Sequence, residues 1–200
     1  MRRTVILFLL GATLGTFGDW MHVMSHTLGY PNPIAPIPWT GQPFWVPFLF
    51  GFAVLSTGQA HLASRSFFCI PPREVPFSTV ITGAIAFLVL YGLSGSLPHN
   101  IGNIRDLVLS IGALSIFIFF DRTIHGLMLG LITALIGTTV EILLTRLGVF
   151  SYSPYFQNLF GVPTWLPWLY LAASVAIGNF VWLLSRKKAE IKSSKSQITT

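Results

Sequence analysis

Charged residues are scarce in this chain of 200 residues, in which Asp, Glu, Lys and Arg together make up 9% and apolar residues 52%. Soluble domains carry about 25% charged residues. The shortage of charge therefore excludes a soluble globular domain and indicates a membrane protein. The 12 basic residues outnumber the 6 acidic ones, but they are dispersed over short loops and one tail, so we expect no nucleic-acid partner.

Cysteine is also nearly absent, since Cys69 is the single one. One cysteine excludes an intrachain disulfide and a metal cluster built from cysteines. The sequence also lacks a glycine-rich phosphate-binding loop and a pair of carboxylates within one apolar run. These absences argue against a hydrolase or a proton-driven pump, so we expect no enzyme and no cofactor.

Long apolar runs dominate the chain instead. A transmembrane helix needs about 20 mostly apolar residues, and six such runs occur, at residues 4–24, 43–63, 77–95, 104–120, 123–147 and 164–185. The predicted fold class is all-α, a polytopic membrane protein with six transmembrane helices. Residues 1–186 would form this transmembrane domain, and residues 187–200 a basic, polar cytoplasmic tail whose composition predicts disorder.

Basic residues are distributed unevenly between the two sets of loops that six spans create. Arg105 and Arg146 fall on one side, and the other ten of the 12 Lys and Arg residues fall on the side of the termini. Basic residues accumulate on the cytoplasmic side of membrane proteins, so we expect both termini to be cytoplasmic. Trp165 and Trp168, at the start of the last run, are expected in the aromatic belt at the opposite interface.

The short segment between the fourth and fifth runs carries both signs of charge, in "FFDRTIHG". So few residues between two helices predict a tight hairpin. Asp121 stands where the N-cap of the next helix is expected. Arg122 can reach the lipid headgroups and add positive charge on the cytoplasmic side. Capping and topology alone would explain both residues, and the alternative is a docking surface for a partner.

A series of short motifs follows in the C-terminal half of the chain. They comprise Phe120, Asp121, Arg122 and Thr123; Gly148, Val149 and Phe150; Ser153 and Pro154; Trp165, Leu166 and Pro167; and Gly178 with Asn179. In order and spacing this series resembles the signature half of the Insig family. Upstream, "PFWVPFLFGFAVLSTG" is similar to the start of that family's second helix, and six spans is the family's number.

The resemblance implies a lipid-binding membrane protein without catalysis. Animal Insig proteins lie in the endoplasmic reticulum, bind oxysterols and hold the sterol-sensing protein Scap, and the counterpart of Asp121 is implicated in holding Scap. The compact form of this chain is more similar to prokaryotic homologues, for which the family implies a central cavity occupied by a lipid such as diacylglycerol. We therefore expect a prokaryotic plasma membrane, and a Scap-like partner and the endoplasmic reticulum only if the source is eukaryotic.

Small and weakly polar residues form one face of the fifth run, at Gly126, Gly130, Thr133, Gly137, Glu141 and Thr145. Such a face indicates close helix packing or the wall of a cavity. Glu141 needs a partner, because a carboxyl near mid-bilayer costs about 2.5–3.5 kcal/mol. Candidate partners are Arg146, a lipid hydroxyl, Gln59 and Asn179.

The sequence therefore predicts a cavity that holds a neutral lipid, either diacylglycerol-like or sterol-like. The residues expected to contact this lipid are Gln59, Thr133, Gly137, Thr138, Glu141 and Asn179. The small-residue faces also predict self-association into a homo-oligomer.

A rival hypothesis rests on "DWMHVMSH", where Asp19, His22 and His26 follow at steps of three and four. Two imidazoles and a carboxylate can bind a metal ion. The chain would then be a small transporter or a metal-dependent lipid-modifying enzyme. However, Gly29 and Pro31 suggest that the helix ends by His26, so the three need not share a face, and we expect no metal.

Overall fold

Six long apolar helices make up the computed structural model, which describes residues 2–71, 73–98 and 103–198. The spans are Arg2–Met24, Val46–Phe67, Phe77–Ser96, Asn103–Phe120, Ile124–Arg146 and Leu166–Ser185. Their ends agree with the six predicted runs to within about one helical turn. The predicted all-α fold with six membrane-spanning helices is thus confirmed.

The first span is built from α1 (Arg2–Leu10), a π-helical turn η1 (Gly11–Gly15) and α2 (Thr16–Met24). The later helices are α3 (Val46–Phe67), α4 (Phe77–Ser96), α5 (Asn103–Phe120), α6 (Ile124–Arg146) and α7 (Leu166–Ile198). Three short elements lie in the loops, namely β1 (Leu28–Gly29), β2 (Ser151–Tyr152) and the 3₁₀ turn η3 (Pro154–Phe156).

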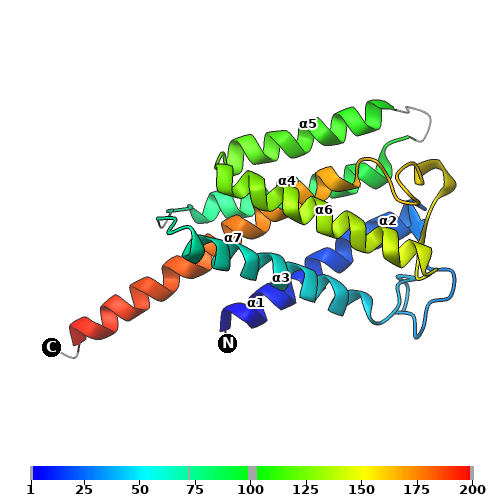
Figure 1. Cartoon of the computed structure of the whole chain (residues 1–200). Coiled ribbons are helices and arrows are strands. Elements are labelled where there is room, and N and C mark those ends of the chain that lie inside the picture. Colours follow the sequence, from blue (N-terminus) through cyan, green and yellow to red (C-terminus); the bar gives the residue numbers. More distant parts are fainter. Residues whose placement is uncertain (1, 72, 99–102, 199–200) are drawn as a thin grey trace.

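The central helix of the bundle is α7, which contacts α3, α4, α5 and α6. Figure 1 shows it running obliquely between α4 and α5 on one side and α3 on the other. Half of its apolar window, 50%, is buried inside the protein, against 22% in each of the other spans. The outer helices instead expose large apolar side chains such as Phe52, Phe119 and Leu135. Such a surface suits contact with lipid chains rather than water.

The bundle has two ends that differ in structure. Both termini and residues 121–123, which join α5 to α6, lie at one end, here called the terminal end, and the loops with β1, β2 and η3 lie at the other, here called the distal end (Figure 1). At the distal end β1 pairs with β2 in antiparallel register, Leu28 opposite Tyr152 and Gly29 opposite Ser151. This pair ties the loop after the first span to the loop after α6. The cytoplasmic position of the terminal end stays a prediction.

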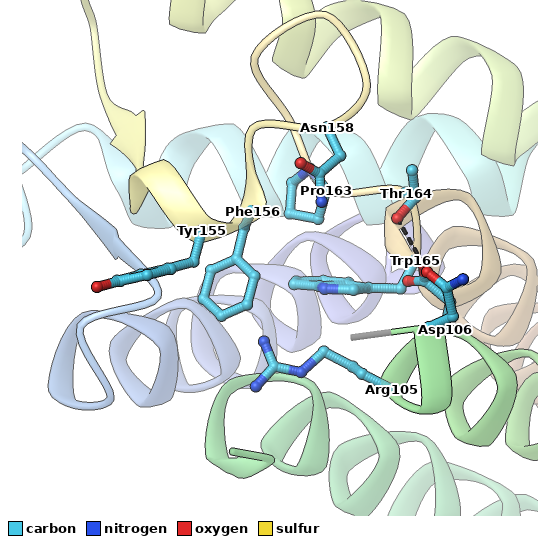
Figure 2. A pocket seen from close by; sticks show the side chains of 9 residues that line it. Arg105, Asp106, Tyr155, Phe156, Asn158, Pro163, Thr164 and Trp165 are labelled. Carbon is cyan, nitrogen blue, oxygen red and sulfur yellow. Dashed lines mark hydrogen bonds between the residues drawn. The ribbon is translucent and has the colours of Figure 1, made fainter. Parts of the chain in front are cut away.

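Two sequence predictions differ from the structure. α7 continues to Ile198, so the described part of the predicted tail is helical, although its composition predicted disorder. Trp165 was expected at the membrane interface, but it is 2% exposed and its ring lies 6.4 Å from that of Phe156 (Figure 2). Its position beside prolines at a helix start suggested an interfacial residue, but the distal loop folds over it.

Candidate functional site

A cavity of about 540 Å³ lies between the helices. Its wall is formed by the first span, α3, α4, α6 and α7, together with residues of the distal loops, and most of the lining side chains are apolar. Ligand pockets commonly measure about 300–1,000 Å³. The cavity is therefore large enough for a small molecule or for part of a lipid.

The mouth of the cavity lies between α3 and α6. Phe52 of α3 and Ile132, Ile136 and Val140 of α6 line the cavity, yet they remain between 41% and 58% exposed. Side chains that are both lining and exposed mark the rim of an opening. Because α3 and α6 both span the membrane, this opening faces the bilayer sideways rather than the water at either end.

Glu141 lies in the cavity wall toward the distal end. The hydroxyl of Tyr152 donates to its Oε2 at 2.5 Å, and the hydroxyl of Tyr170 donates to its Oε1 at 2.6 Å. Burial and the neighbouring Glu141 carboxylate raise the pKa of Tyr152 well above its usual value, so the phenol stays protonated and continues to donate. Glu141 is thus bonded by two tyrosines rather than by Arg146 or an amide.

Gly137 allows the contact between Tyr170 and Glu141. It precedes Glu141 by one turn of α6, and a Cβ atom at this position would lie 2.5 Å from Cε1 and 2.6 Å from Cδ1 of the Tyr170 ring. Those distances are shorter than real carbon contacts. The absence of a side chain at Gly137 therefore lets the ring pack closely against α6, with its hydroxyl at Glu141.

A second carboxylate, that of Asp19, lines the same cavity. Its Oδ2 accepts hydrogen bonds from Gln42 Nε2 at 2.7 Å and from the Tyr30 hydroxyl at 2.8 Å. Burial, followed by the charge of Asp19, raises the pKa of Tyr30, so this phenol also remains a donor. The β1–β2 pair positions both loop tyrosines, since Tyr30 follows β1 directly and Tyr152 ends β2. The distal part of the cavity thus carries two carboxylates, the buried Asp19 and the half-buried Glu141, each with two side-chain donors.

A different polar group lies farther toward the terminal end. His61 of α3 is 2% exposed, and its Nε2 lies 3.0 Å from Ser174 Oγ of α7. The hydroxyl of Thr133 donates to the same Ser174 oxygen at 3.3 Å. His61 and Thr133 both line the cavity, so a bound molecule would meet a histidine and a hydroxyl there.

Three of the six residues predicted to contact a lipid line the cavity, namely Thr133, Gly137 and Glu141. Gln59 is exposed and lies away from the face of α3 that carries His61. Thr138 and Asn179 are buried but are not part of the lining, and Asn179 Nδ2 donates to the carbonyl oxygen of Phe120 at 3.0 Å. The sequence showed these polar residues within apolar runs but could not show which way each points.

The predicted rival metal cluster is not assembled. Asp19 is bonded to Gln42, and His22 Nε2 lies 2.7 Å from Ser94 Oγ. His26 follows the end of α2 and is exposed, with φ of 55°. Within residues 2–71, 73–98 and 103–198, no group of three or more His, Cys, Asp or Glu is placed to hold a metal ion.

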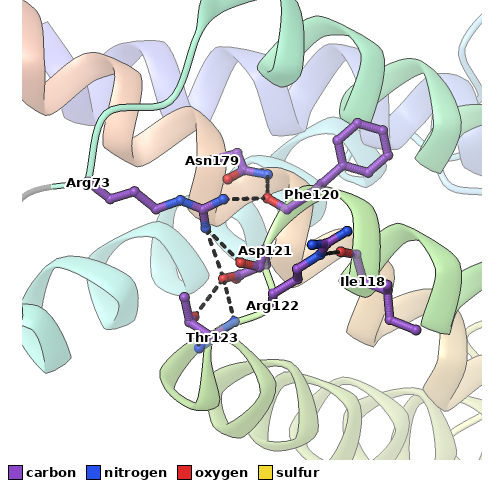
Figure 3. Close-up of polar contacts among 8 residues, drawn as sticks. Arg73, Ile118, Phe120, Asp121, Arg122, Thr123 and Asn179 are labelled. Carbon is purple, nitrogen blue, oxygen red and sulfur yellow. Dashed lines mark hydrogen bonds and ion pairs between the residues drawn. The ribbon is translucent and has the colours of Figure 1, made fainter.

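The hairpin between α5 and α6 is held by Arg73, which reaches it from the loop before α4 (Figure 3). Arg73 Nη1 forms an ion pair with Asp121 Oδ1 at 3.2 Å and donates to the Asp121 carbonyl oxygen at 3.0 Å. Its Nη2 donates to the Phe120 carbonyl oxygen at 3.3 Å, the same oxygen that Asn179 bonds. The sequence did not predict this role of Arg73, because a single arginine in a proline-containing loop belongs to no recognisable motif.

The N-cap of α6 is Thr123, not Asp121 as the sequence suggested. Thr123 Oγ1 accepts from Gly126 N at 2.9 Å and donates to Asp121 Oδ1 at 2.6 Å. Asp121 thus supports the cap indirectly, because its carboxylate orients the capping hydroxyl of Thr123. Arg122 is exposed at φ of 62°, and its Nε donates to the carbonyl oxygen of Ile118.

Comparison with known proteins identifies relatives of this chain. No family model matches it, but individual proteins do. The chain is 34% identical over 175 residues to an INSIG protein homolog of Mycolicibacterium vanbaalenii, covering 86% of this chain and 82% of that protein. It is 26% identical over 183 residues to the insulin-induced gene 1 protein of Danio rerio, covering 90% of this chain and 70% of the relative.

Solved structures agree with these similarities. The crystal structure of the mycobacterial Insig homolog MvINS matches with a TM-score of 0.81 and 31% identity, covering 91% of this chain and 93% of MvINS. A cross-linked MvINS trimer matches with a TM-score of 0.82, covering 92% of this chain and 94% of that chain.

Proposed function

The chain belongs to the Insig family, and we propose that it binds a neutral lipid, diacylglycerol or a sterol, between its helices without catalysing a reaction. The observation that carries this proposal is the apolar cavity of about 540 Å³, whose mouth faces the bilayer between α3 and α6. A lipid could enter there directly from the membrane. Water-soluble ligands would have to cross the hydrocarbon layer first.

The charges of the cavity favour a neutral head that carries hydroxyl groups. Asp19 and Glu141 both line the cavity and accept hydrogen bonds. Each carboxylate oxygen has room for more than one hydrogen bond, so a glycerol or sterol hydroxyl can donate to it. Neither carboxyl group offers the positive charge that binds a phosphate head. Thr133 and His61 would supply further polar contacts, whereas the positions of Gln59, Thr138 and Asn179 favour structural roles.

We also propose a homo-oligomer in the plasma membrane of a prokaryote. The cross-linked trimer of the mycobacterial homologue supports self-association, and the bacterial relative supports the choice of membrane. A Scap-like partner belongs to this proposal only if the source is eukaryotic. The exposed Arg122, rather than the largely covered Asp121, would then be the residue that such a partner meets first.

The experiment compares lipid retention by two variants of α3. Ala53 and Ala63 are both exposed alanines on this helix, but Ala53 lines the cavity and Ala63 does not. Protein purified in detergent would be incubated with deuterium-labelled diacylglycerol or sterol, washed, and extracted for mass spectrometry. We expect wild-type protein and Ala63→Phe to retain about one neutral lipid per chain and Ala53→Phe to lose most of it, because a phenyl ring fills the space.

Equal retention by both variants would place the lipid outside the cavity. Preparations from several detergents that contain no neutral lipid and take up none of the labelled lipid would refute the proposal altogether.

A further inference from the structure

A second cavity, of about 90 Å³, lies at the distal end, between the start of α5 and the loop that carries η3. Figure 2 shows the guanidinium group of Arg105 beneath the ring of Phe156, with the indole of Trp165 beside them. All three residues line this cavity. It is separate from the large lipid cavity, to which α5 contributes no described residue.

Arg105 is a buried cation that forms no hydrogen bond with any described residue. Its side chain is 3% exposed, and Nε, Nη1 and Nη2 are all buried with no acceptor in the part of the chain that the structure describes. The contact that the guanidinium does make is with the face of Phe156, 4.3 Å from the ring centroid. A cation–π contact offsets part of the lost hydration but satisfies none of the five N–H donors. Burying such a group is costly unless an anion accepts from it.

The neighbouring carboxylate does not supply this acceptor. Asp106 Oδ2 accepts from Thr164 Oγ1 at 2.8 Å, and Figure 2 shows its carboxylate beside Thr164, away from the guanidinium. Among the described residues the one ion pair is that of Arg73 with Asp121, at the other end of the bundle. Asp106 thus acts on the charge of Arg105 only through space, and no described residue forms an ion pair or a hydrogen bond with the guanidinium group.

A second unsatisfied donor belongs to the same cavity. Trp165 is 2% exposed, and its indole Nε1 is buried without a hydrogen-bond partner among the described residues. Buried tryptophan N–H groups normally find an acceptor. The lining therefore holds one carboxylate, that of Asp106, which is bonded to Thr164, and two buried donor groups without an acceptor among the described residues, so the missing component is an acceptor for Arg105 and Trp165.

The size and depth of the cavity indicate which anion fits. A volume of about 90 Å³ is one sixth of the 540 Å³ of the large cavity, so the space suits a group as small as one phosphate rather than a whole lipid. The cavity lies at the end of a membrane span, where lipid phosphates are found. Arginine binds phosphate with two parallel N–H···O bonds. We propose that Arg105 and Trp165 form a binding site for a phosphate group, supplied by a phospholipid head or by free phosphate.

The test measures thermal stability of the full-length protein in a neutral, phosphate-free detergent at constant ionic strength. The probes are inorganic phosphate, dihexanoyl phosphatidylglycerol, and dihexanoylglycerol, which has the same chains without phosphate. We expect a saturable rise in Tm of about 5 °C or more with at least one phosphate-bearing probe. A response to inorganic phosphate identifies a free-anion site, and a response to phosphatidylglycerol alone identifies a headgroup site.

Matched variants assign the response to this site. Arg105→Gln should abolish it, whereas Arg146→Gln should retain it, since Arg146 is the other distal arginine and is exposed. Trp165→Phe removes a single donor and should raise the half-saturating concentration about tenfold, so the site can be tested even if Arg105→Gln does not fold. The proposal is overturned if neither phosphate-bearing probe raises Tm, or if Arg105→Gln or Trp165→Phe responds to that probe as wild type does. A rise in Tm caused by binding in the large cavity, as with dihexanoylglycerol, would persist in Arg105→Gln, so the failure of one proposal can be told from the failure of the other.

Discussion

Substitution of Gly137 by alanine should disconnect Tyr170 from Glu141. The added Cβ would lie 2.5 Å from Cε1 of the Tyr170 ring, so the ring must move away from α6 and carry its hydroxyl from the carboxylate, now 2.6 Å away. Crowding a well-packed contact costs about 1–3 kcal/mol, and loss of a hydrogen bond at a buried polar group costs about 1–3 kcal/mol. The two costs together are about 4 kcal/mol, and the helix preference of alanine over glycine offsets up to about 1 kcal/mol. We therefore expect Gly137→Ala to lower the free energy of unfolding by about 3 kcal/mol.

Gly92→Ala is the matched control in another span. A Cβ atom at Gly92 would have Met21 Sδ as its nearest neighbour at 3.4 Å, which is an ordinary contact, and alanine favours a helix by up to about 1 kcal/mol over glycine. Denaturant titration in detergent micelles, followed by tryptophan fluorescence, gives the unfolding free energy of each variant. Gly92→Ala should match or exceed wild type.

A double-mutant cycle tests the mechanism of the Gly137 effect. Tyr170→Phe removes the hydroxyl and keeps the ring. If Gly137→Ala acts partly by displacing that hydroxyl, the two substitutions share one lost hydrogen bond and their effects should not add, with a coupling of about 1 kcal/mol or more. Fully additive effects, or a Gly137→Ala variant as stable as Gly92→Ala, would show that the reasoning about this contact is wrong.

Three further predictions concern the loops. Thr123→Ala removes the N-cap of α6 and should cost about 1 kcal/mol of unfolding free energy, whereas Thr139→Ala, on the exposed face of the same helix, should cost less than about 0.5 kcal/mol. Arg73→Gln removes the bonds to the hairpin and should increase hydrogen exchange at Thr123 and the residues beside it. Because burial raises the pKa of Tyr152 above its unfolded value near 10, its contribution to stability is complete below about pH 10 and falls as the pH rises further, and Tyr152→Phe should flatten this loss in thermal unfolding measured against pH.

The helices were predictable because each is a long apolar run with clear boundaries. Pro47 and Pro167 fall in the first turns of α3 and α7, where the missing N–H removes no helical bond. The central role of α7 was not visible in its composition, since every span is apolar. It follows from packing, because α7 contacts four other helices and its buried face is larger.

Part of the cavity lining could be predicted from the sequence. Glu141 and Thr133 stood out because polar groups within a membrane span need a reason to be there. Their partners did not stand out, since Tyr152 lies in a loop and Tyr170 in another helix, and no sequence spacing connects either to Glu141. The β1–β2 pair, which carries Tyr152 to the cavity, is two residues long on each strand, too short for a recognisable alternation pattern.

Asp121 has a structural role in the hairpin between α5 and α6 that does not require a partner. Asp121 Oδ1 already accepts from Arg73 and from both the N–H and the hydroxyl of Thr123, and a Cβ atom at Gly126 would collide with the same carboxylate. Any substitution of Asp121 must therefore release Arg73 and disturb the cap of α6, whether or not a partner is present. Loss of partner binding on mutation of Asp121 would consequently reflect an altered hairpin. A docking role needs evidence from an exposed residue such as Arg122, whose change to glutamine leaves the Asp121 bonds intact.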